Sequence, residues 1–208
     1  MSDHATVFAI VPVGALEGAK SRLGAVLDAE ERHALAERLT RRTIAAAVAT
    51  PGIAETLVIT PDDEVRGLAL ELGARPMRQR STGLNDGLRE ARHEAIAAGA
   101  EAILVVPIDV PWVTPDAMAP LVALAAGAAG PLVALVPDRH GRGTNALLLA
   151  PPDVIDFRFG GDSRNAHRAA AEVANAAFVE LDGPLMMDVD TSEDLLLAQA
   201  EAPELVSG

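Results

Sequence analysis

Short apolar runs alternate with longer segments of helical pattern along this chain, and this alternation most restricts the folds that it can adopt. Runs rich in Val, Ile and Leu occur at residues 6–13, 56–60, 102–108, 131–136 and 145–150. Such runs are typical of strands buried on two faces, which occur in mainly parallel sheets covered by helices. The order predicts an α/β fold with a mixed, mainly parallel sheet and helices on both faces, in one domain over residues 1–208.

Helices are predicted between these runs, and several of their ends carry capping signals. Asp28 with Glu31 three residues later is typical of a capping box, and Gly73 is typical of a helix end. The segment between Lys20 and Asp28 is expected to be extended. The predicted helical ranges are residues 28–50, 62–73, 85–100, 163–176 and 191–202, with a further helix in the first part of residues 117–137, before AAGP.

The composition excludes several classes of protein. A formal net charge of −13 argues against a nucleic-acid partner, because no basic excess neutralises phosphates. The absence of cysteine excludes thiolate chemistry and fits a reducing compartment, so we expect a cytoplasmic protein. The N-terminus lacks the basic region of a signal peptide. Residues 117–137 are uncharged, but prolines and glycines interrupt them, so no membrane partner is expected.

The segment GALEGAKS, residues 14–21, follows the first predicted strand and differs from a P-loop at one position. The P-loop pattern requires glycine where this chain has Ala19, and it requires a helix that starts at the lysine. Here the helix signal comes only at Asp28. Three interpretations stay open, which are a P-loop, a plain surface turn, and a loop that brings the side chains of Lys20 and Arg22 to phosphates.

Aspartates follow apolar stretches at two places. Asp109 ends the run AILVVPID, and Asp188 and Asp190 are two residues apart in MDVD, so an extended backbone points both to one side. If all three meet about 4 Å apart, each like-charge pair costs about 4 kcal/mol at an effective dielectric near 20. An all-carboxylate set without His or Cys indicates Mg²⁺ or Mn²⁺. The alternative is that Asp190 caps the last helix and Asp109 belongs to a turn.

Two glycine-rich segments are candidate anion sites. GRGTNA, residues 141–146, precedes a strand and offers Thr144, although it also fits a hairpin turn. RFGGDSRNAH, residues 158–167, leads into a helix and places Ser163 near its N-terminus, where an ordinary N-cap at Asp162 or Ser163 is equally compatible. His167 is expected on the surface or behind a binding site.

Six of these motifs, in order, resemble one protein family over nearly the whole chain. The set is VPV…AKSRL, GLN, PIDVP, GTNALLL, FGGDS…H and DVDTSEDL. It is similar to the guanylyltransferases that make the phospholactyl or phosphoenolpyruvyl guanosine diphosphate precursor of coenzyme F-420. The resemblance implies a nucleotidyltransferase-like fold, GTP and phosphoenolpyruvate or 2-phospho-L-lactate as substrates, and pyrophosphate as the second product. A homodimer is left open.

The resemblance also implies roles for particular residues. Metal ions would be held by Asp109, Asp188 and Asp190; the acceptor by Thr144, Gly160 and Ser163; and the nucleotide by Pro12, Gly14, Lys20, Arg22 and Asn85, with Asp109, Lys20 and Arg22 as the catalytic set. Two positions depart from the family pattern, since Gly14 replaces a lysine and Asp162 replaces a glycine found in many relatives. A related nucleotidyltransferase with another acceptor or nucleotide, or a degenerate nucleotide-binding protein, remains the alternative.

Overall fold

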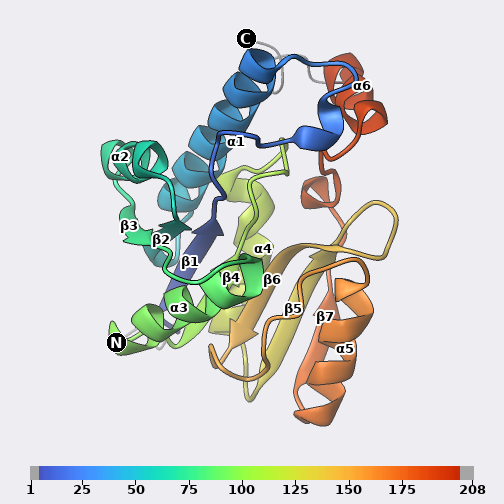
Figure 1. Cartoon of the computed structure of the whole chain (residues 1–208). Coiled ribbons are helices and arrows are strands. Elements are labelled where there is room, and N and C mark those ends of the chain that lie inside the picture. Colours follow the sequence, from blue (N-terminus) through green and yellow to red (C-terminus); the bar gives the residue numbers. More distant parts are fainter. Residues whose placement is uncertain (1–4, 202–208) are drawn as a thin grey trace.

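A computed structural model describes residues 5–201, which form one seven-stranded sheet flanked by helices (Figure 1). The spatial order of the strands is β3-β2-β1-β4-β6-β5-β7. Strand β6 runs antiparallel to both of its neighbours, and the other neighbouring pairs are parallel. The strands are β1 (Val7–Pro12), β2 (Ile53–Thr60), β3 (Arg75–Arg78), β4 (Ala102–Val105), β5 (Leu132–Pro137), β6 (Thr144–Ala150) and β7 (Ala177–Glu180).

The helices begin and end close to the predicted positions. Asp28 forms the expected capping box with Glu31 at the start of α1. The elements are η1 (Ser21–Leu23), α1 (Ala29–Ala49), α2 (Asp63–Glu71), α3 (Leu84–Ala97), α4 (Pro115–Ala126), α5 (Ser163–Val173), η2 (Pro184–Met186) and α6 (Ser192–Glu201). Within residues 5–201, the structure contains no helix with the length and apolar character that a membrane crossing needs.

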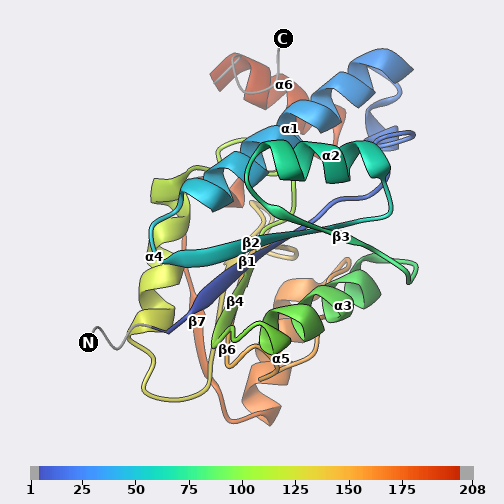
Figure 2. The same cartoon turned by 90° about the vertical axis from the view of Figure 1, so that its left-hand side faces the viewer.

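The sheet is buried on both faces, as the mixed, mainly parallel architecture predicts. Figure 2 shows α1 and α2 on one side of the sheet and α3 and α5 on the other. Because successive strand residues point to opposite faces, β1 sends Ala9 and Val11 into the core that contains α1, α2 and α4. The same strand sends Phe8 and Ile10 into the core that contains α3 and α5. These two cores hold the sheet in place.

A third, smaller core closes the end of the molecule where the parallel strands finish. Leu23 of η1 and Leu35 of α1 pack there against Val189 and against Leu195 of α6. Figure 1 shows α6 beside α1 and the segment that follows β1, although α6 lies at the other end of the sequence. This packing brings two segments to the same edge of the sheet. One is the lysine loop, which follows β1 and carries Gly14, Lys20 and Arg22, and the other is the MDVD segment.

Strand β6 contains one extra residue relative to its partner β5. Val136 pairs with Ala146, whereas Pro137 pairs with Thr144, so Asn145 has no partner of its own. Such a β-bulge changes which way the following side chains point. Ala146 belongs to the core of α1 and α4, and regular alternation would send Thr144 to that same side. Instead, Thr144 contacts His167 of α5 on the opposite side.

The predicted architecture is confirmed, and two kinds of detail differ. Strands β3 and β7 were not predicted, because they are short, only partly buried edge strands that carry no continuous apolar run. The prediction of an extended segment after Lys20 is wrong. The N–H group of Leu23 donates to the carbonyl oxygen of Lys20, and the N–H group of Leu27 donates to the carbonyl oxygen of Leu23. Leu23 is completely buried in these turns.

Candidate functional site

The three predicted aspartates lie on two segments that a backbone hydrogen bond joins. Asp109 follows β4, and Asp188 and Asp190 lie between η2 and α6. The N–H of Val189 donates to the carbonyl oxygen of Asp109 at 2.8 Å. Because Val189 is buried in the small core, the side chains before and after it are directed elsewhere. The two segments thus gather three carboxyl groups at one edge of the sheet.

The aspartate cluster carries more negative charge than the protein neutralises. Burial raises the pKa of Asp109, the nearby Asp190 raises it further, and Lys20 opposes this. Burial and then repulsion from Asp109 raise the pKa of Asp188 to about 6. The Oδ1 atom of Asp109 is buried and has no hydrogen-bond partner in the described part of the chain. Such an unpaired buried carboxylate oxygen fits a site that binds a cation.

The aspartate oxygens are spread more widely than the spacing of about 4 Å considered from the sequence. Within residues 5–201, the only group of three His or acidic side chains whose ligand atoms all lie within 4.8 Å of one another is His33, Glu37 and Glu64. That group lies on the surface between α1 and α2, and Glu37 already pairs with Arg41. The role of the three aspartates as metal ligands stays a prediction.

Lys20 and Arg22 extend from the loop after β1 to the aspartate cluster. The Lys20 ammonium donates to the carbonyl oxygen of Val189 at 2.7 Å and lies 3.6 Å from Asp190 Oδ1. Arg22 Nη1 lies 3.6 Å from Asp190 Oδ2, and its side chain is 77 % exposed. Lys20 has a left-handed backbone, with φ 52° and ψ 36°. This conformation is strained for a residue other than glycine, and such strain gathers at functional sites.

Asp190 does not cap the last helix. Thr191 and Asp194 cap it reciprocally, since Asp194 N–H donates to Thr191 Oγ1 and Thr191 N–H donates to Asp194 Oδ2. The Asp190 carboxylate is left facing Lys20 and Arg22. A cavity of about 350 Å³ lies at this point, lined by residues 19–22, Ala36, Ile108 and Asp190. It joins the two basic side chains to one carboxylate of the cluster.

The start of the lysine loop is held by backbone contacts. Val13, just beyond Pro12, donates its N–H to the carbonyl of Ile59, and Leu16 N–H donates to Asp62 Oδ2 at 3.0 Å. Gly14 is exposed, and a Cβ added there would have no neighbouring atom within 4 Å. A lysine would therefore fit at this position, so packing does not explain why this chain has glycine. Pro12 and Gly14 remain predicted nucleotide contacts.

A second polar cluster lies on the other side of β6. Thr144 Oγ1 is 3.1 Å from His167 Nδ1, and Ser163 Oγ is 3.0 Å from Thr144 Oγ1. All three side chains are buried, so the surface position considered for His167 is wrong. The amphipathic pattern of α5 explains this, because its apolar face also contains the fully buried Ala171 one turn later. Gly160 is exposed and lies in the loop that leads to Ser163.

Asn85 is engaged within the protein. Its amide group donates to the carbonyl of Phe159 at 3.0 Å and accepts from the N–H of Phe159 at 2.9 Å. These two bonds fasten the start of α3 to the loop before Ser163. The structure therefore brings Asn85 beside the predicted acceptor residues, and its contact with the nucleoside stays a prediction.

Asn145 was not identified from the sequence. Its amide donates to the carbonyl of Leu185 at 3.0 Å, and its side chain also bonds to Asp188. It therefore supports a carboxylate of the aspartate cluster while its neighbour Thr144 belongs to the other cluster. The signal available in the sequence was a polar residue at the head of an otherwise apolar strand. The sequence does not show that this residue is 94 % buried.

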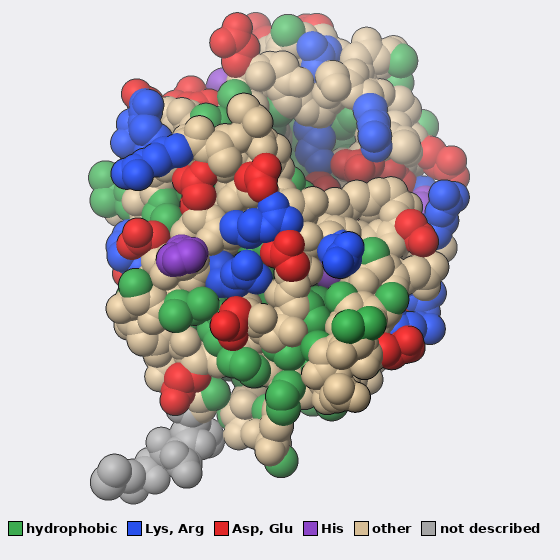
Figure 3. All heavy atoms as spheres, turned by 60° about the horizontal axis from the view of Figure 1, so that its bottom comes forward, with side chains coloured by type: hydrophobic (Ala, Val, Ile, Leu, Met, Phe, Trp, Pro, Cys, Tyr) green, Lys and Arg blue, Asp and Glu red, His purple; other side chains and the backbone are tan. Residues whose placement is uncertain are grey.

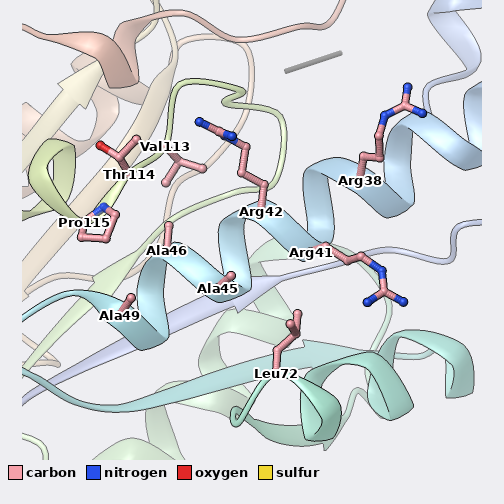
Figure 4. A pocket seen from close by; sticks show the side chains of 10 residues that line it. All are labelled: Arg38, Arg41, Arg42, Ala45, Ala46, Ala49, Leu72, Val113, Thr114 and Pro115. Atoms are coloured by element: carbon pink, nitrogen blue, oxygen red, sulfur yellow. The ribbon is translucent and has the colours of Figure 1, made fainter. Parts of the chain in front are cut away.

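A groove of about 580 Å³ shares no lining residue with either polar cluster. It is lined by Arg38, Arg41 and Arg42, by alanines of α1, by Leu72 just after α2, and by Val113, Thr114 and Pro115 at the start of α4. Figure 4 shows Arg42 pointing toward the loop before α4, while Arg38 and Arg41 point away in other directions. On the face shown in Figure 3, basic and acidic side chains are interleaved rather than separated into patches. Neither feature gathers unneutralised carboxylates as the aspartate cluster does.

Comparison with known proteins links these features to one family. The family model described as "Guanylyl transferase CofC like" matches residues 7–199. The chain is 41 % identical over 196 residues to a phosphoenolpyruvate guanylyltransferase of Rubrobacter xylanophilus, covering 94 % of each protein.

Solved structures show the same fold at low sequence identity. A protein of Desulfovibrio desulfuricans described as a nucleotide-diphospho-sugar transferase superposes with a TM-score of 0.76 at 16 % identity, covering 97 % of this chain and 89 % of that one. Glucosyl-3-phosphoglycerate synthase of Mycobacterium tuberculosis, in complex with Mn²⁺ and uridine diphosphate, superposes with a TM-score of 0.59 at 13 % identity, covering 85 % and 70 %. These likenesses confirm the nucleotidyltransferase-like fold.

Proposed function

Because this chain belongs to the CofC-like guanylyl transferase family, we propose that it transfers the guanylyl group of GTP to phosphoenolpyruvate, as the name of its relative from Rubrobacter xylanophilus indicates for that protein. A phosphate oxygen of the acceptor bonds to the α-phosphorus of GTP, and the bond from that phosphorus to the β-phosphate oxygen breaks. Pyrophosphate leaves, and the product is a guanosine diphosphate-linked acid of coenzyme F-420 biosynthesis.

The observation that carries this proposal is the pairing of an under-neutralised aspartate cluster with two basic side chains. Lys20 and Arg22 both lie 3.6 Å from Asp190. A triphosphate in the adjacent cavity would meet these cations on one side. On the other side, its own negative charge would meet carboxylates unless a cation lay between them. The arrangement therefore suits a substrate that arrives with a divalent ion.

The aspartate cluster fits a divalent metal ion. Asp109, Asp188 and Asp190 would hold it, because the buried Oδ1 of Asp109 has no protein partner and the ligand set contains only oxygen. Mg²⁺ is the metal that we propose, with Mn²⁺ as an alternative. When bound, such an ion neutralises phosphate charge and stabilises the leaving pyrophosphate.

The acceptor is proposed to bind beside the second cluster. Thr144 and Ser163 lie 3.0 Å apart through their hydroxyl oxygens, and Gly160 lies in the loop that leads to Ser163. Ser163 is the first residue of α5, whose N-terminal N–H groups favour an anion. Because the acceptor phosphate is already anionic, its attack requires no strong general base. Catalysis then depends on holding two polyanions together in the correct orientation.

Mass analysis of the reaction products tests this function. The full-length chain is incubated with Mg²⁺, with each of the four nucleoside triphosphates, and with phosphoenolpyruvate or 2-phospho-L-lactate. We expect pyrophosphate release with GTP, and an adduct whose mass equals GMP plus the acceptor minus water. Phosphoenolpyruvate is the expected acceptor.

Other outcomes identify the alternatives. Equal or greater turnover with 2-phospho-L-lactate would change the acceptor, and adduct formation with CTP would change the nucleotide. Binding of GTP without pyrophosphate release from either acid would contradict the proposed function and favour a degenerate nucleotide-binding protein.

A further inference from the structure

His167 is completely buried and contacts polar groups through both of its ring nitrogens. Nδ1 lies 3.1 Å from Thr144 Oγ1, and Nε2 accepts the backbone N–H of Arg158 at 3.1 Å. The ring also meets Phe159 edge to face, with centroids 5.2 Å apart. Since Asn85 fastens Phe159 to α3, the imidazole is held between three elements of the fold.

These contacts determine which nitrogen of His167 carries the proton. A backbone N–H can only donate, so Nε2 must be the accepting nitrogen and carries no hydrogen. Burial, together with the charge of Arg158, lowers the pKa of His167 to about 4, so the ring is neutral at neutral pH. The single ring hydrogen is therefore on Nδ1, from which it donates to Thr144 Oγ1.

The cluster then holds one more hydrogen than its internal contacts use. His167 Nδ1–H and the hydroxyl groups of Thr144 and Ser163 supply three hydrogens, and two contacts join the three side chains. If Ser163 donates to Thr144, the Thr144 hydrogen is unused; if Thr144 donates to Ser163, the Ser163 hydrogen is unused. In residues 5–201, neither hydroxyl has a further acceptor among its hydrogen bonds.

A buried hydroxyl hydrogen without an acceptor is unfavourable until an oxygen atom arrives to accept it. The open loop at Gly160 and the N-terminus of α5 adjoin the cluster. The side chain of Asp162 does not cap that helix, although the N–H groups of Ser163 and Arg164 already donate to backbone carbonyl groups. Anionic oxygen is the ligand that both features favour. The unused hydroxyl hydrogen is the observation that indicates an oxygen ligand, and the positive end of the α5 dipole favours an anionic one.

We infer that His167 is a positioning residue for the acceptor: through its Nδ1–H it directs the Thr144–Ser163 hydroxyl pair so that one O–H donates to an anionic oxygen of the three-carbon acid. This inference rests on the proposed function. His167 itself does not touch the acceptor. With a side chain at position 167 that accepts a hydrogen bond instead of donating one, Thr144 could turn its hydrogen inward, and the outward donor would be lost.

Two substitutions separate the two contacts of the ring. The side-chain amide nitrogen of asparagine lies where Nδ1 lies, so His167→Asn keeps the donor to Thr144 and loses the acceptor for Arg158. The amide oxygen of glutamine reaches the position of Nε2, so His167→Gln keeps the acceptor and loses the donor. The exposed His93 of α3 provides a matched control, His93→Gln.

Steady-state kinetics with phosphoenolpyruvate and GTP are measured on each variant that retains the wild-type circular dichroism spectrum and GTP binding. We expect His167→Gln to raise the KM for phosphoenolpyruvate about tenfold, as loss of one hydrogen bond to an anion does, with the KM for GTP within about twofold of wild type. His167→Asn is expected to keep the acceptor KM within about threefold, although it unfolds at lower denaturant concentration.

An acceptor KM that is unchanged in His167→Gln would overturn the inference while leaving the proposed function intact. Equal increases in His167→Asn and His167→Gln, or parallel increases in both KM values, would assign His167 a purely structural role and would also overturn it. A wild-type chain that turns over neither acid would refute the proposed function, and this inference with it. Should His167→Gln fail to fold, an unchanged acceptor KM in Thr144→Val would overturn the inference in its place.

Discussion

Two consecutive residues of β6 contact the two polar clusters of the site, which are the aspartate cluster and the cluster of Thr144, Ser163 and His167, here called the hydroxyl cluster. The two clusters differ in how completely the protein supplies partners for their polar groups. Asn145 supports Asp188 on one side of the strand, where three carboxyl groups meet Lys20 and Arg22. Thr144 contacts His167 on the other side, where every group is neutral at neutral pH. Burial destabilises ionised carboxylates far more than neutral hydroxyls.

The difference indicates which polar groups lack a partner within the protein and are therefore available to a ligand. The aspartate cluster lacks positive charge, and a metal ion would supply it. The hydroxyl cluster lacks one acceptor oxygen, and an anionic substrate would supply it. One side of β6 is therefore suited to a cation and the other to an anion, which is the arrangement needed to bring a metal-bound triphosphate and a phospho-acid together.

The strongest test of this contrast removes one charge from the aspartate cluster. Asp188→Asn keeps an oxygen that can accept from Asn145, and we expect metal-dependent turnover to fall at least about 100-fold. The metal-free variant should nevertheless be more stable than wild type at pH 7.5, by about 1 kcal/mol after allowance for solvent screening. The reason is that the raised pKa of Asp188 reports a destabilised carboxylate.

Pyrophosphate release and urea unfolding in the presence of a chelator measure the two effects. Glu64→Gln, in the surface group near α1, serves as the control and should change neither. A destabilised Asp188→Asn protein, or one that retains full turnover, would show that the aspartate cluster is not short of positive charge.

The hydroxyl cluster should respond to pH through His167. Its pKa is about 4 in the folded protein and about 6.5 when unfolded, so the unfolded chain binds more protons between these values. The contribution of His167 to the unfolding free energy is therefore most favourable above about pH 6.5, and it becomes less favourable as the pH falls toward 4. Between pH 7.5 and pH 5 we expect a loss of about 2 kcal/mol in unfolding free energy.

Urea unfolding at a series of pH values measures this loss, as the difference between wild type and His167→Gln. The His93→Gln protein should follow the wild-type profile. Parallel profiles for wild type and His167→Gln would mean that the imidazole is not held neutral by burial.

A smaller effect is expected from the residue that supports the aspartates from β6. Asn145→Ala removes the bonds to Leu185 and Asp188, so the MDVD segment loses an anchor. We expect turnover to decrease about tenfold, with the unfolding free energy lowered by about 1 kcal/mol. Kinetics at saturating acceptor measure the decrease. Unfolding without any kinetic change would limit Asn145 to a structural role.

The smallest expected effect comes from the lysine loop. Gly14 has space for a side chain, and Gly14→Lys introduces the lysine that the family resemblance implies at this position. Added positive charge near the triphosphate should lower the KM for GTP about threefold at low salt, because the net charge of −13 otherwise repels this substrate. Gly14→Gln adds similar bulk without charge and should leave the KM unchanged. Equal effects of both variants would exclude an electrostatic cause.

The sequence predicts the parts of this molecule that depend on local pattern. Apolar runs and capping residues identify β1, β5, α1 and α2 because strand burial and helix ends have short-range causes. Strands β3 and β7 escape prediction, since pairing with a neighbour rather than their own composition makes them strands. The turns of η1 escape it because they form to bury Leu23 against distant residues.

The residues of the candidate site also divide into those that a local sequence pattern predicts and those that depend on distant contacts. Asp109, Asp188 and Asp190 are recognisable because each stands at the end of an apolar stretch or in a repeated acidic pattern. The burial of His167 and the support from Asn145 depend on contacts across 23 and 40 residues respectively, between Thr144 and His167 and between Asn145 and Leu185. No window of sequence contains these contacts, so only the assembled fold reveals them.

The unpaired residue in β6 has a consequence for how proteins of this design can vary. Deleting Asn145 would restore an ordinary ladder with β5, and Thr144, then directly before Ala146, would still face α5. Such a shortened chain would lose the amide that supports Asp188 on the metal side of β6, and it would keep the hydroxyl group of Thr144 on the acceptor side. The extra residue therefore adds a support for the aspartates without displacing the acceptor side, so the two sides of β6 can change independently of one another.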